Sequence, residues 1–319
     1  MSKKASQYQK KTPREHVLLR PDTYIGDIEK TNEQMYVYDQ EFSNISKNNI
    51  SYVPGLLKIF DELLVNARDA GSNDKTCNMI KVNFDHEEGC ITVWNNGQDG
   101  IPVEEHPEHK LLVPSMIFGE LLTSSNYDDD EKRTTGGRNG YGAKLANIFS
   151  TKFTVEVGDS KNNKKFIQTW TDNMSASEKA KVTKYSQKNS YVKISFYPDF
   201  DKLHLTKEIV FNSEEPTSHE KLFKRRCMDI AGTSGLDTTG KNTEGMKVYF
   251  NDEKLATTNF KKYIEAYGRI NDEPETLYYD DSTKRWEVGV LYRPDAGFEV
   301  ISFVNGISTF NGGTHANHV

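Results

Sequence analysis

Apolar and polar residues alternate along several short stretches of the chain, and this period of two is typical of half-buried β-strands. Seven stretches predict strands on this pattern: 80–84, 90–94, 153–157, 166–170, 191–197, 287–292 and 298–304. The polar sequence DHEEG joins the first two and predicts a hairpin. A break is expected near Tyr267, and the polar stretches 212–220 and 233–244 are interpreted as surface insertions.

A period of 3.6 replaces this alternation between residues 53 and 70 and predicts a helix, with Gly71 as its expected end. The apolar residues that form one face of this helix are Leu56, Leu57, Phe60, Leu63, Leu64 and Ala67. Two shorter helices are expected, one near 114–122 with a proline at its start and one that begins near Gly142.

Glu62, Asn66 and Asp69 lie on the opposite side of the long helix, within an arc of about 60°. An ordinary solvated helix face would explain this stripe. Asparagine, however, is a poor residue for a helix interior, because its side chain competes for the backbone. Chemically, Glu62 could accept a proton from an attacking water. Asn66 could offer a neutral oxygen to Mg²⁺, which prefers few protein ligands together with phosphate and water.

Asn95 follows the second strand of the hairpin directly, in the sequence NNGQDG. The glycines allow a close approach of the backbone, so a polar side chain at this strand end could recognise the edge of a base. A simple Asn-Gly turn is the alternative.

The sequence GGRNGYGAK, which runs directly into the third helix, is rich in glycine. It departs from the P-loop, because Ala143 precedes Lys144 and no Ser or Thr follows, and its glycine order differs from GxGxxG. Backbone N–H groups at glycines and at a helix start can nevertheless bind phosphate. Lys144 in the first turn opposes the helix dipole, and a bound phosphate would remove that conflict. The alternative is a flexible surface loop.

The composition is that of a globular protein of about two domains, with 319 residues, 28% charged and 35% hydrophobic. The net charge is −6, so any DNA contact by this chain is expected to be local or transient. No apolar run is long enough to span a membrane, and no membrane partner is expected. The scattered Cys77, Cys90 and Cys227 make neither a disulfide framework nor a metal spacing. Trp94, Trp170 and Trp286 are expected in the core.

Several motifs closely resemble the ATPase region of eukaryotic type II DNA topoisomerases. They are YQKKTPREHVLLRPDTYIG, DELLVNARDA, WNNG with GIP, IFGELLTSSNYDDDEK, TGGRNGYGAKLANIFSTKFTVE and SFVNGISTFNGGTH, and together they cover the chain from about Tyr8 to its last residue. The resemblance implies an α+β fold of the GHKL (Bergerat) type, a sandwich of a mixed sheet with helices on one face. It also implies residues 1–28 as an N-terminal strap, 29–265 as the ATPase domain and 266–319 as the beginning of a truncated transducer domain.

The resemblance further implies ATP and Mg²⁺ as cofactors and a role for each site residue. Glu62 would activate the attacking water, Asn66 would bind Mg²⁺, and Asn95 would recognise adenine. Asp69 is expected among the residues that bind the nucleotide. The remaining nucleotide contacts would come from Ser124, Ser125, Asn126, Gly137, Arg138, Asn139, Gly140, Tyr141, Gly142, Ala143 and Lys144, and from Tyr8 of the strap of the other subunit.

Three departures from the family pattern bear on these expectations. NNGQDGIP is one residue longer than the usual motif near Gln98, and Val192 stands where the family often has a threonine near adenine. The chain also ends before the loop whose glutamine and lysine reach the γ-phosphate in the family, so ATP binding with weak turnover is expected.

The function implied is an ATP-driven gate in the nucleus, in which nucleotide closes a homodimer and the full-length enzyme passes one DNA duplex through a break in another. Two alternatives stay open. One is another GHKL ATPase, such as a heat-shock chaperone, a histidine kinase or a mismatch-repair protein. The other is a non-hydrolysing module in which ATP only joins two chains.

Overall fold

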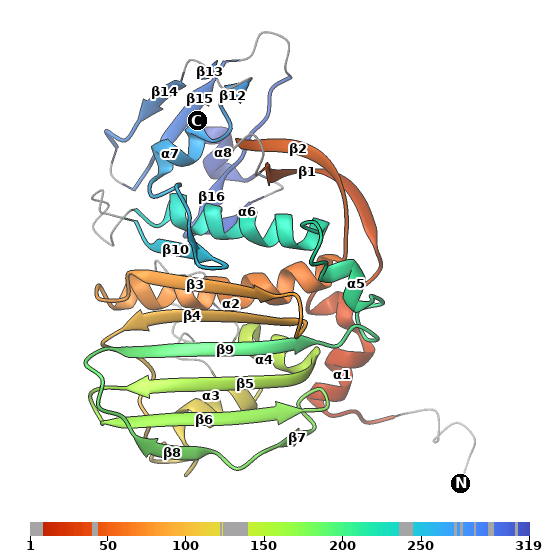
Figure 1. The fold of residues 1–319 in the computed structure, drawn as a ribbon, viewed down its shortest axis with the longest axis vertical. Helices are drawn as coiled ribbons and strands as arrows, with labels where there is room; N and C mark the ends of the chain where they lie inside the picture. The colour runs from red at the N-terminus through yellow and green to blue at the C-terminus, as the bar shows by residue number, and fades with distance from the viewer. Residues whose placement is uncertain are drawn as a thin grey trace.

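A computed structural model describes residues 9–39, 44–121, 123, 140–235, 245–270, 273–274, 277–283, 285–292, 297–309 and 312–319 (Figure 1). Its helices are α1 (Pro13–Leu19), the 3-10 turn η2 (Pro21–Thr23), α2 (Pro54–Asn73), α3 (Val113–Gly119), α4 (Gly142–Ile148), α5 (Lys207–Val210), α6 (Ser218–Thr233), α7 (Phe260–Glu265) and α8 (Thr314–His318). The strands of the first half are β1 (Thr31–Asp39), β2 (Asn44–Tyr52), β3 (Met79–Asp85), β4 (Cys90–Gly97), β5 (Ser150–Asp159), β6 (Lys164–Thr171), β7 (Ala176–Ser177), β8 (Lys181–Lys184) and β9 (Ser190–Pro198). Those of the second half are β10 (Lys247–Phe250), β11 (Glu253–Lys254), β12 (Arg269–Ile270), β13 (Glu273–Pro274), β14 (Leu277–Asp280), β15 (Val288–Leu291), β16 (Phe303–Val304) and β17 (Ile307–Ser308).

The central element is a nine-stranded sheet in the order β11-β10-β3-β4-β9-β5-β6-β7, with β8 also paired to β6. The sheet is mixed, because β10 runs parallel to β3 whereas the other pairs are antiparallel. Figure 1 shows the strands face on, with α2, α3 and α4 behind them. The other face of these strands carries no helix in this view, so the expected arrangement of a mixed sheet with helices on one face is confirmed.

The alternation read from the sequence sets this arrangement. In β3 the side chains of Ile80, Val82 and Phe84 are buried while the residues between them are exposed, so one face of the strand faces the core. The predicted hairpin between β3 and β4 and the strands β5, β6 and β9 are confirmed within a few residues at their ends. The strand predicted at 298–304 is wrong for most of its length, since only Phe303–Val304 is a strand.

The end expected for the long helix at Gly71 is wrong, because α2 continues to Asn73 and the N–H of Asp74 caps it on the carbonyl of Ala70. A Cβ at Gly71 would lie 2.8 Å from the carbonyl oxygen of Cys77. Glycine at this position therefore serves close packing against the returning chain rather than termination of the helix.

Helix α6 begins inside the stretch 212–220 that was interpreted as a surface insertion, and that interpretation is wrong for its last residues. Thr217 caps the helix by accepting from the N–H of Glu220, and both His219 and Glu220 are buried. The helix was missed because its sequence, SHEKLFKRRCMDIAGT, is rich in charges that hydropathy assigns to the surface. The second stretch, 233–244, falls mostly outside the described residues.

Charged side chains of α6 form a buried network with its neighbours. Arg226 donates to Asp61 of α2 at 2.6 and 2.9 Å and to Asp229 at 2.6 Å. Asp229 also accepts from Arg225 and from the hydroxyl of Tyr263 on α7, each at 2.7 Å. We call Asp61, Arg225, Arg226, Asp229 and Tyr263 the α6 charge network. It joins α2, α6 and α7 through ionic hydrogen bonds among well-buried groups.

The N-terminal strap predicted for residues 1–28 is packed onto the body from its second part onward. Thr12 and Glu15 form a capping box at the start of α1, and Val17 of that helix is fully buried. The hairpin of β1 and β2, which has no counterpart among the predicted strands, follows and packs on α6. The strap and domain boundaries stay predictions.

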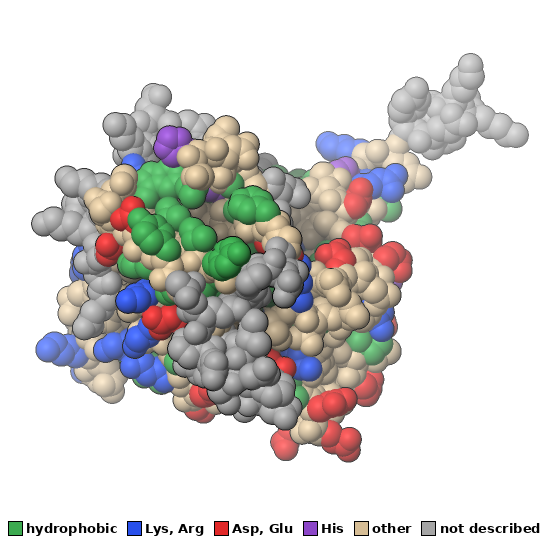
Figure 2. All heavy atoms as spheres, turned by 90° about the horizontal axis from the view of Figure 1, so that it is seen from above, with side chains coloured by type: hydrophobic (Ala, Val, Ile, Leu, Met, Phe, Trp, Pro, Cys, Tyr) green, Lys and Arg blue, Asp and Glu red, His purple; other side chains and the backbone are tan. Residues whose placement is uncertain are grey.

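Apolar side chains gather on the surface formed by the C-terminal strands. Figure 2 shows this green area, and the exposed side chains over β14, β15 and the chain that follows include Tyr278, Val290, Tyr292, Phe298 and Val300. Within the described part of the chain, no helix is both long and apolar enough to cross a membrane.

Candidate functional site

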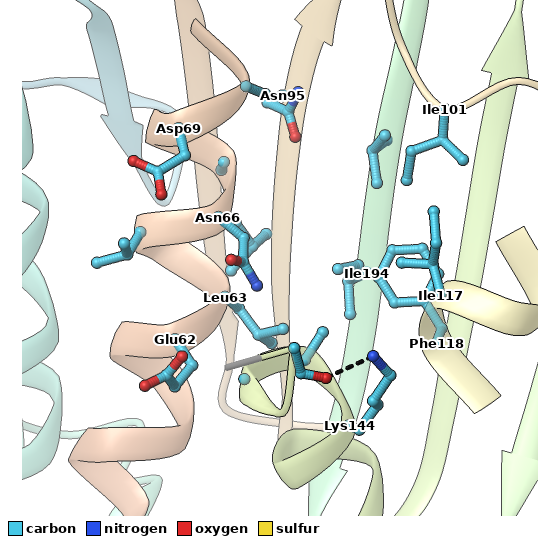
Figure 3. A pocket seen from close by; sticks show the side chains of 18 of the residues that line it. Glu62, Leu63, Asn66, Asp69, Asn95, Ile101, Ile117, Phe118, Lys144 and Ile194 are labelled. Carbon is cyan, nitrogen blue, oxygen red and sulfur yellow. Dashed lines mark hydrogen bonds between the residues drawn. The ribbon is translucent and has the colours of Figure 1, made fainter. Parts of the chain in front are cut away.

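A cavity of about 1180 Å³ opens between α2 and the sheet, and α3 and α4 complete its walls (Figure 3). Glu62, Asn66 and Asp69 of α2 line one side of it, Asn95 of β4 lies at its far end, and Gly140 to Lys144 line the opposite end. The structure thus brings the acid-and-amide stripe, the strand-end amide and the start of the glycine-preceded helix into one space. These three features are separated by up to about eighty positions in the sequence.

The stripe on α2 is arranged as the helical period predicts, with Glu62, Asn66 and Asp69 one above the other in Figure 3. Asn66 has an exposed side chain although its neighbours on either side are buried, so its amide faces the cavity. The carboxylate of Glu62 forms an ion pair with Lys58, one turn earlier on α2, at 2.6 Å. Asp69 is buried and pairs with Arg68 at 3.1 Å, so its carboxylate is held at the edge of the cavity.

The start of α4 explains two of the glycines in the loop. Gly140 has a φ of +64°, a left-handed conformation that side chains with a Cβ rarely adopt. A Cβ at Gly142 would lie 2.2 Å from Oε2 of Glu62. Only glycine allows the first turn of α4 to approach the carboxylate of α2 this closely, and the free N–H groups of that turn thereby come next to the candidate base.

Lys144 lies in the first turn of α4 and is almost completely buried. Its ammonium donates to the carbonyl oxygens of Thr123 at 2.7 Å and Gly140 at 2.5 Å. Burial lowers the pKa of Lys144 to about 8, and no carboxylate of the described residues forms an ion pair with it. The positive charge of the Lys144 ammonium is therefore balanced only by neutral carbonyl groups, and this favours the binding of an anion in the cavity.

Asn95 is held in one orientation by its amide nitrogen. The nitrogen donates to the carbonyl oxygen of Asn96 at 3.1 Å and contacts the sulfur of Cys77 at 3.6 Å. The amide oxygen is left toward the cavity, as Figure 3 shows, and can accept a hydrogen bond from a ligand. Val192, which stands where the family often has a threonine, is the direct partner of Asn95 on β9 and so lies beside its amide.

Apolar side chains form the wall between the two polar ends of the cavity. The residues that contribute to it include Val93, Ile101, Ile117, Phe118, Val192 and Ile194. Such a slot suits a flat heteroaromatic ring whose polar edge meets Asn95.

The longer loop after β4 is fixed by Asp74. Its carboxylate accepts from the backbone N–H of Gln98 at 2.6 Å and of Asp99 at 2.8 Å. The extra residue at Gln98 is therefore absorbed without closing the cavity, and Gly100 still lines it.

Sequence reasoning missed several residues of this cavity. Tyr24, near η2, lines it and packs its ring against Tyr141 at a centroid distance of 5.9 Å. Lys58 was missed as the partner of Glu62, and Ile307 of the C-terminal strands was missed as a lining residue. The position of Lys58 four residues before Glu62 on a helix was the one available signal.

Several predicted site residues lie outside the described residues: Tyr8, Ser124, Ser125, Asn126, Gly137, Arg138 and Asn139. Tyr141, Gly142 and Ala143 are described and line the cavity with Gly140 and Lys144.

Comparison with known proteins identifies the family of this chain. Residues 52–199 match the family model described as "Histidine kinase-, DNA gyrase B-, and HSP90-like ATPase". The chain is 46% identical to DNA topoisomerase 2 of Drosophila melanogaster over 98% of its own length, and 46% identical to DNA topoisomerase 2-alpha of Homo sapiens over the same share. It spans about a fifth of the length of these relatives, 20% and 19% respectively.

Solved structures extend the likeness to the fold. The ATPase region of Saccharomyces cerevisiae topoisomerase II superposes with a TM-score of 0.88 at 43% identity, over 98% of this chain and 78% of that one. The 43K ATPase domain of Thermus thermophilus gyrase B superposes with a TM-score of 0.60 at 21% identity, over 95% of this chain and 69% of that one, and shares the fold. The fold and the cavity define a GHKL-type ATPase domain. The chain belongs to the eukaryotic type II DNA topoisomerase family and corresponds to its N-terminal ATPase region.

Proposed function

We propose that this chain binds and hydrolyses ATP and that it serves as the N-terminal gate of a type II DNA topoisomerase. The observation that carries the proposal is the convergence of Glu62 and the first turn of α4 on one cavity, with Asn95 at its other end. Adenine would lie against the apolar wall with its amino group on the amide oxygen of Asn95. The triphosphate would then extend toward the N–H groups at Gly140–Lys144.

Each polar residue of the cavity has a distinct task in this proposal. Glu62 accepts the proton of the water that attacks the γ-phosphate, and the ion pair with Lys58 orients that carboxylate. The first-turn N–H groups of α4 stabilise the charge that develops on the phosphoryl oxygens. The remaining nucleotide contacts are proposed to come from Asp69, Tyr8, Ser124, Ser125, Asn126, Gly137, Arg138 and Asn139.

Asn66 fits a magnesium ion, because its amide is exposed to the cavity one turn along α2 from Glu62, on the side toward Asn95. One neutral oxygen suits an ion whose remaining ligands are phosphate and water. The ion would neutralise charge on the triphosphate. Asn66 would position it.

Replacement of Asn66 by alanine tests this assignment. We expect Asn66→Ala to weaken the affinity for Mg·ATP by about 10- to 100-fold, as is usual for loss of one bond to a charged group. Isothermal titration calorimetry measures the effect. The same titration in EDTA should show little difference between variant and wild type. Asn83→Ala, at an exposed position of β3 outside the cavity, is the matched control. An unchanged affinity for Mg·ATP would remove the metal role from Asn66.

Lys144 provides a test that needs no turnover. Burial lowers its pKa to about 8, so about half of the side chains are neutral at pH 8. A triphosphate in the cavity favours the ammonium form and raises this pKa, so nucleotide binding between about pH 8 and 9 should be accompanied by proton uptake. Titrations in two buffers of different ionisation enthalpy measure the uptake. Lys144→Arg, which stays charged throughout, should lose it, and equal uptake in the variant would contradict a triphosphate at Lys144.

At the level of the whole protein, we propose that ATP closes a homodimer in the nucleus, where the closed gate captures a DNA duplex for passage through a break made elsewhere in the full-length enzyme. The γ-phosphate would hold the closed state, and its loss on hydrolysis would release the contacts that depend on it. The family comparisons favour this reading over other GHKL ATPases. A non-hydrolysing ATP-dependent dimer is the alternative, and it predicts that the wild-type enzyme releases no phosphate from bound ATP.

A further inference from the structure

The face of the sheet opposite the cavity carries a row of lysine and aromatic side chains. The strand registers place eight residues side by side, one on each of eight neighbouring strands: Lys254, Tyr249, Lys81, Trp94, Lys193, Glu156, Ile167 and Lys181. We call these residues the lysine row. Because side chains alternate along a strand, the row points away from the buried core positions and from α2, α3 and α4, which lie behind the sheet in Figure 1.

This face is basic in an acidic chain. The other charged residues that point the same way are Lys152, Lys165, Lys247 and Asp85. Seven lysines therefore stand against two carboxylates, a local charge of +5 in a chain whose net charge is −6. Lys165 pairs with Glu156 at 3.2 Å, whereas the other six amines have no ion pair to any carboxylate in the described ranges. Six of the seven lysines are exposed, so their charge faces solvent.

Two aromatic side chains of the row make cation–π contacts with Lys81. The amine of Lys81 lies 5.6 Å from the ring centres of both Trp94 and Tyr249, a cation–π arrangement on two sides. Trp94, which was expected in the core, is half-buried on this open face and stacks on Tyr191 at 6.3 Å. The Trp94 ring therefore lies between a cation and a neighbouring ring.

We propose that the lysine row binds the phosphate backbone of duplex DNA. Neighbouring strands lie about 4.8 Å apart, so the seven steps of the row span about 34 Å, close to one turn of B-DNA. Lysine contacts phosphate as a point charge, and the row has no arginine to read base edges, so the contact is independent of sequence. The proposal deepens the proposed function, since duplex DNA is the substrate proposed above, but binding at this face requires no nucleotide.

The test is the salt dependence of duplex binding by Lys81→Gln/Lys193→Gln. Fluorescence anisotropy with a labelled duplex of about two helical turns gives the affinity at a series of salt concentrations. If the four lysines of the row each neutralise one phosphate, log K against log salt has a slope near −3.6 for the wild type, from about −0.9 per contact. The variant should lose about two contacts, giving a slope near −1.8, and bind at least about tenfold more weakly at low salt.

Lys202→Gln/Lys262→Gln is the matched control, because it removes the same charge from exposed positions off this face. Thermal melting and Mg·ATP titration of all three proteins show whether fold and cavity are intact. Equal slopes for the row variant and the wild type would overturn the proposal, as would an equal loss in the control. Tighter binding of a single-stranded oligonucleotide than of the duplex would overturn it in favour of base stacking. Loss of ATP binding with normal DNA binding would count against the proposed function only.

Discussion

Glu62→Gln is expected to reduce ATP hydrolysis by the full-length enzyme by about 10²- to 10⁴-fold while nucleotide binding is retained. Glutamine keeps the size and the hydrogen-bonding oxygen of the side chain but cannot accept the proton of the attacking water. The approach of Gly142 to this side chain is preserved, because glutamine adds no bulk beside Gly142, where a Cβ would lie 2.2 Å from Oε2 of Glu62. Steady-state phosphate release measures turnover, and calorimetry with a non-hydrolysable ATP analogue measures binding.

Glu88→Gln, at an exposed position in the hairpin between β3 and β4, is the matched control and should hydrolyse ATP like the wild type. Turnover of Glu62→Gln within tenfold of the wild type would show that Glu62 is not the base. Absence of phosphate release by the wild-type enzyme would favour the non-hydrolysing alternative. Normal dimer closure with abolished hydrolysis would instead separate the binding step from the chemical step.

Asp229→Asn is expected to lower the free energy of unfolding by about 3–5 kcal/mol, the usual cost of removing one partner from a buried ionic pair. Asp229 is 2% exposed and accepts from Arg225, Arg226 and Tyr263. The amide carries no charge to compensate two buried guanidinium groups, and its nitrogen would face donors rather than acceptors. Urea unfolding followed by circular dichroism measures the loss.

Asp201→Asn changes the same chemistry at an exposed position and should shift stability by no more than a few tenths of a kcal/mol. Arg226→Met with Asp229→Leu is a useful third protein, because apolar replacement of a whole buried pair is often neutral. A loss below about 1 kcal/mol for Asp229→Asn would mean that water reaches the α6 charge network, and that α2 and α6 are joined by apolar packing alone.

The parts of the structure that follow from local periodicity were predictable from the sequence. The face of α2 that packs on the sheet and the stripe that carries Glu62 and Asn66 both follow from a period of 3.6. The position of Asn95 follows from alternation along β4, because residues 93 and 95 point the same way. These patterns are local, so a single sequence suffices to read them.

Other features depend on partners that are distant in sequence. A hydropathy pattern assigns Arg226 to the surface, because it is charged. Its burial is possible only because it pairs with Asp61, which lies 165 positions earlier in the sequence. Trp94 was expected in the core because it is large and aromatic, but its strand position places it on the outer face, where Lys81 and Tyr191 cover it. The ammonium of Lys144 was expected to face phosphate, and its bonds to Thr123 and Gly140 become visible only when the loop is folded.

Strand β4 contributes to both surfaces described above, since Asn95 lines the cavity and Trp94 belongs to the lysine row on the opposite face. Side chains change sides at every step of a strand, so a one-residue insertion or deletion within Cys90–Gly97 would exchange the two. The indole would then enter the apolar slot of the cavity while the amide turned outward, and both proposed functions would be lost together. Length variation among natural variants should therefore be confined to the turns that flank this strand.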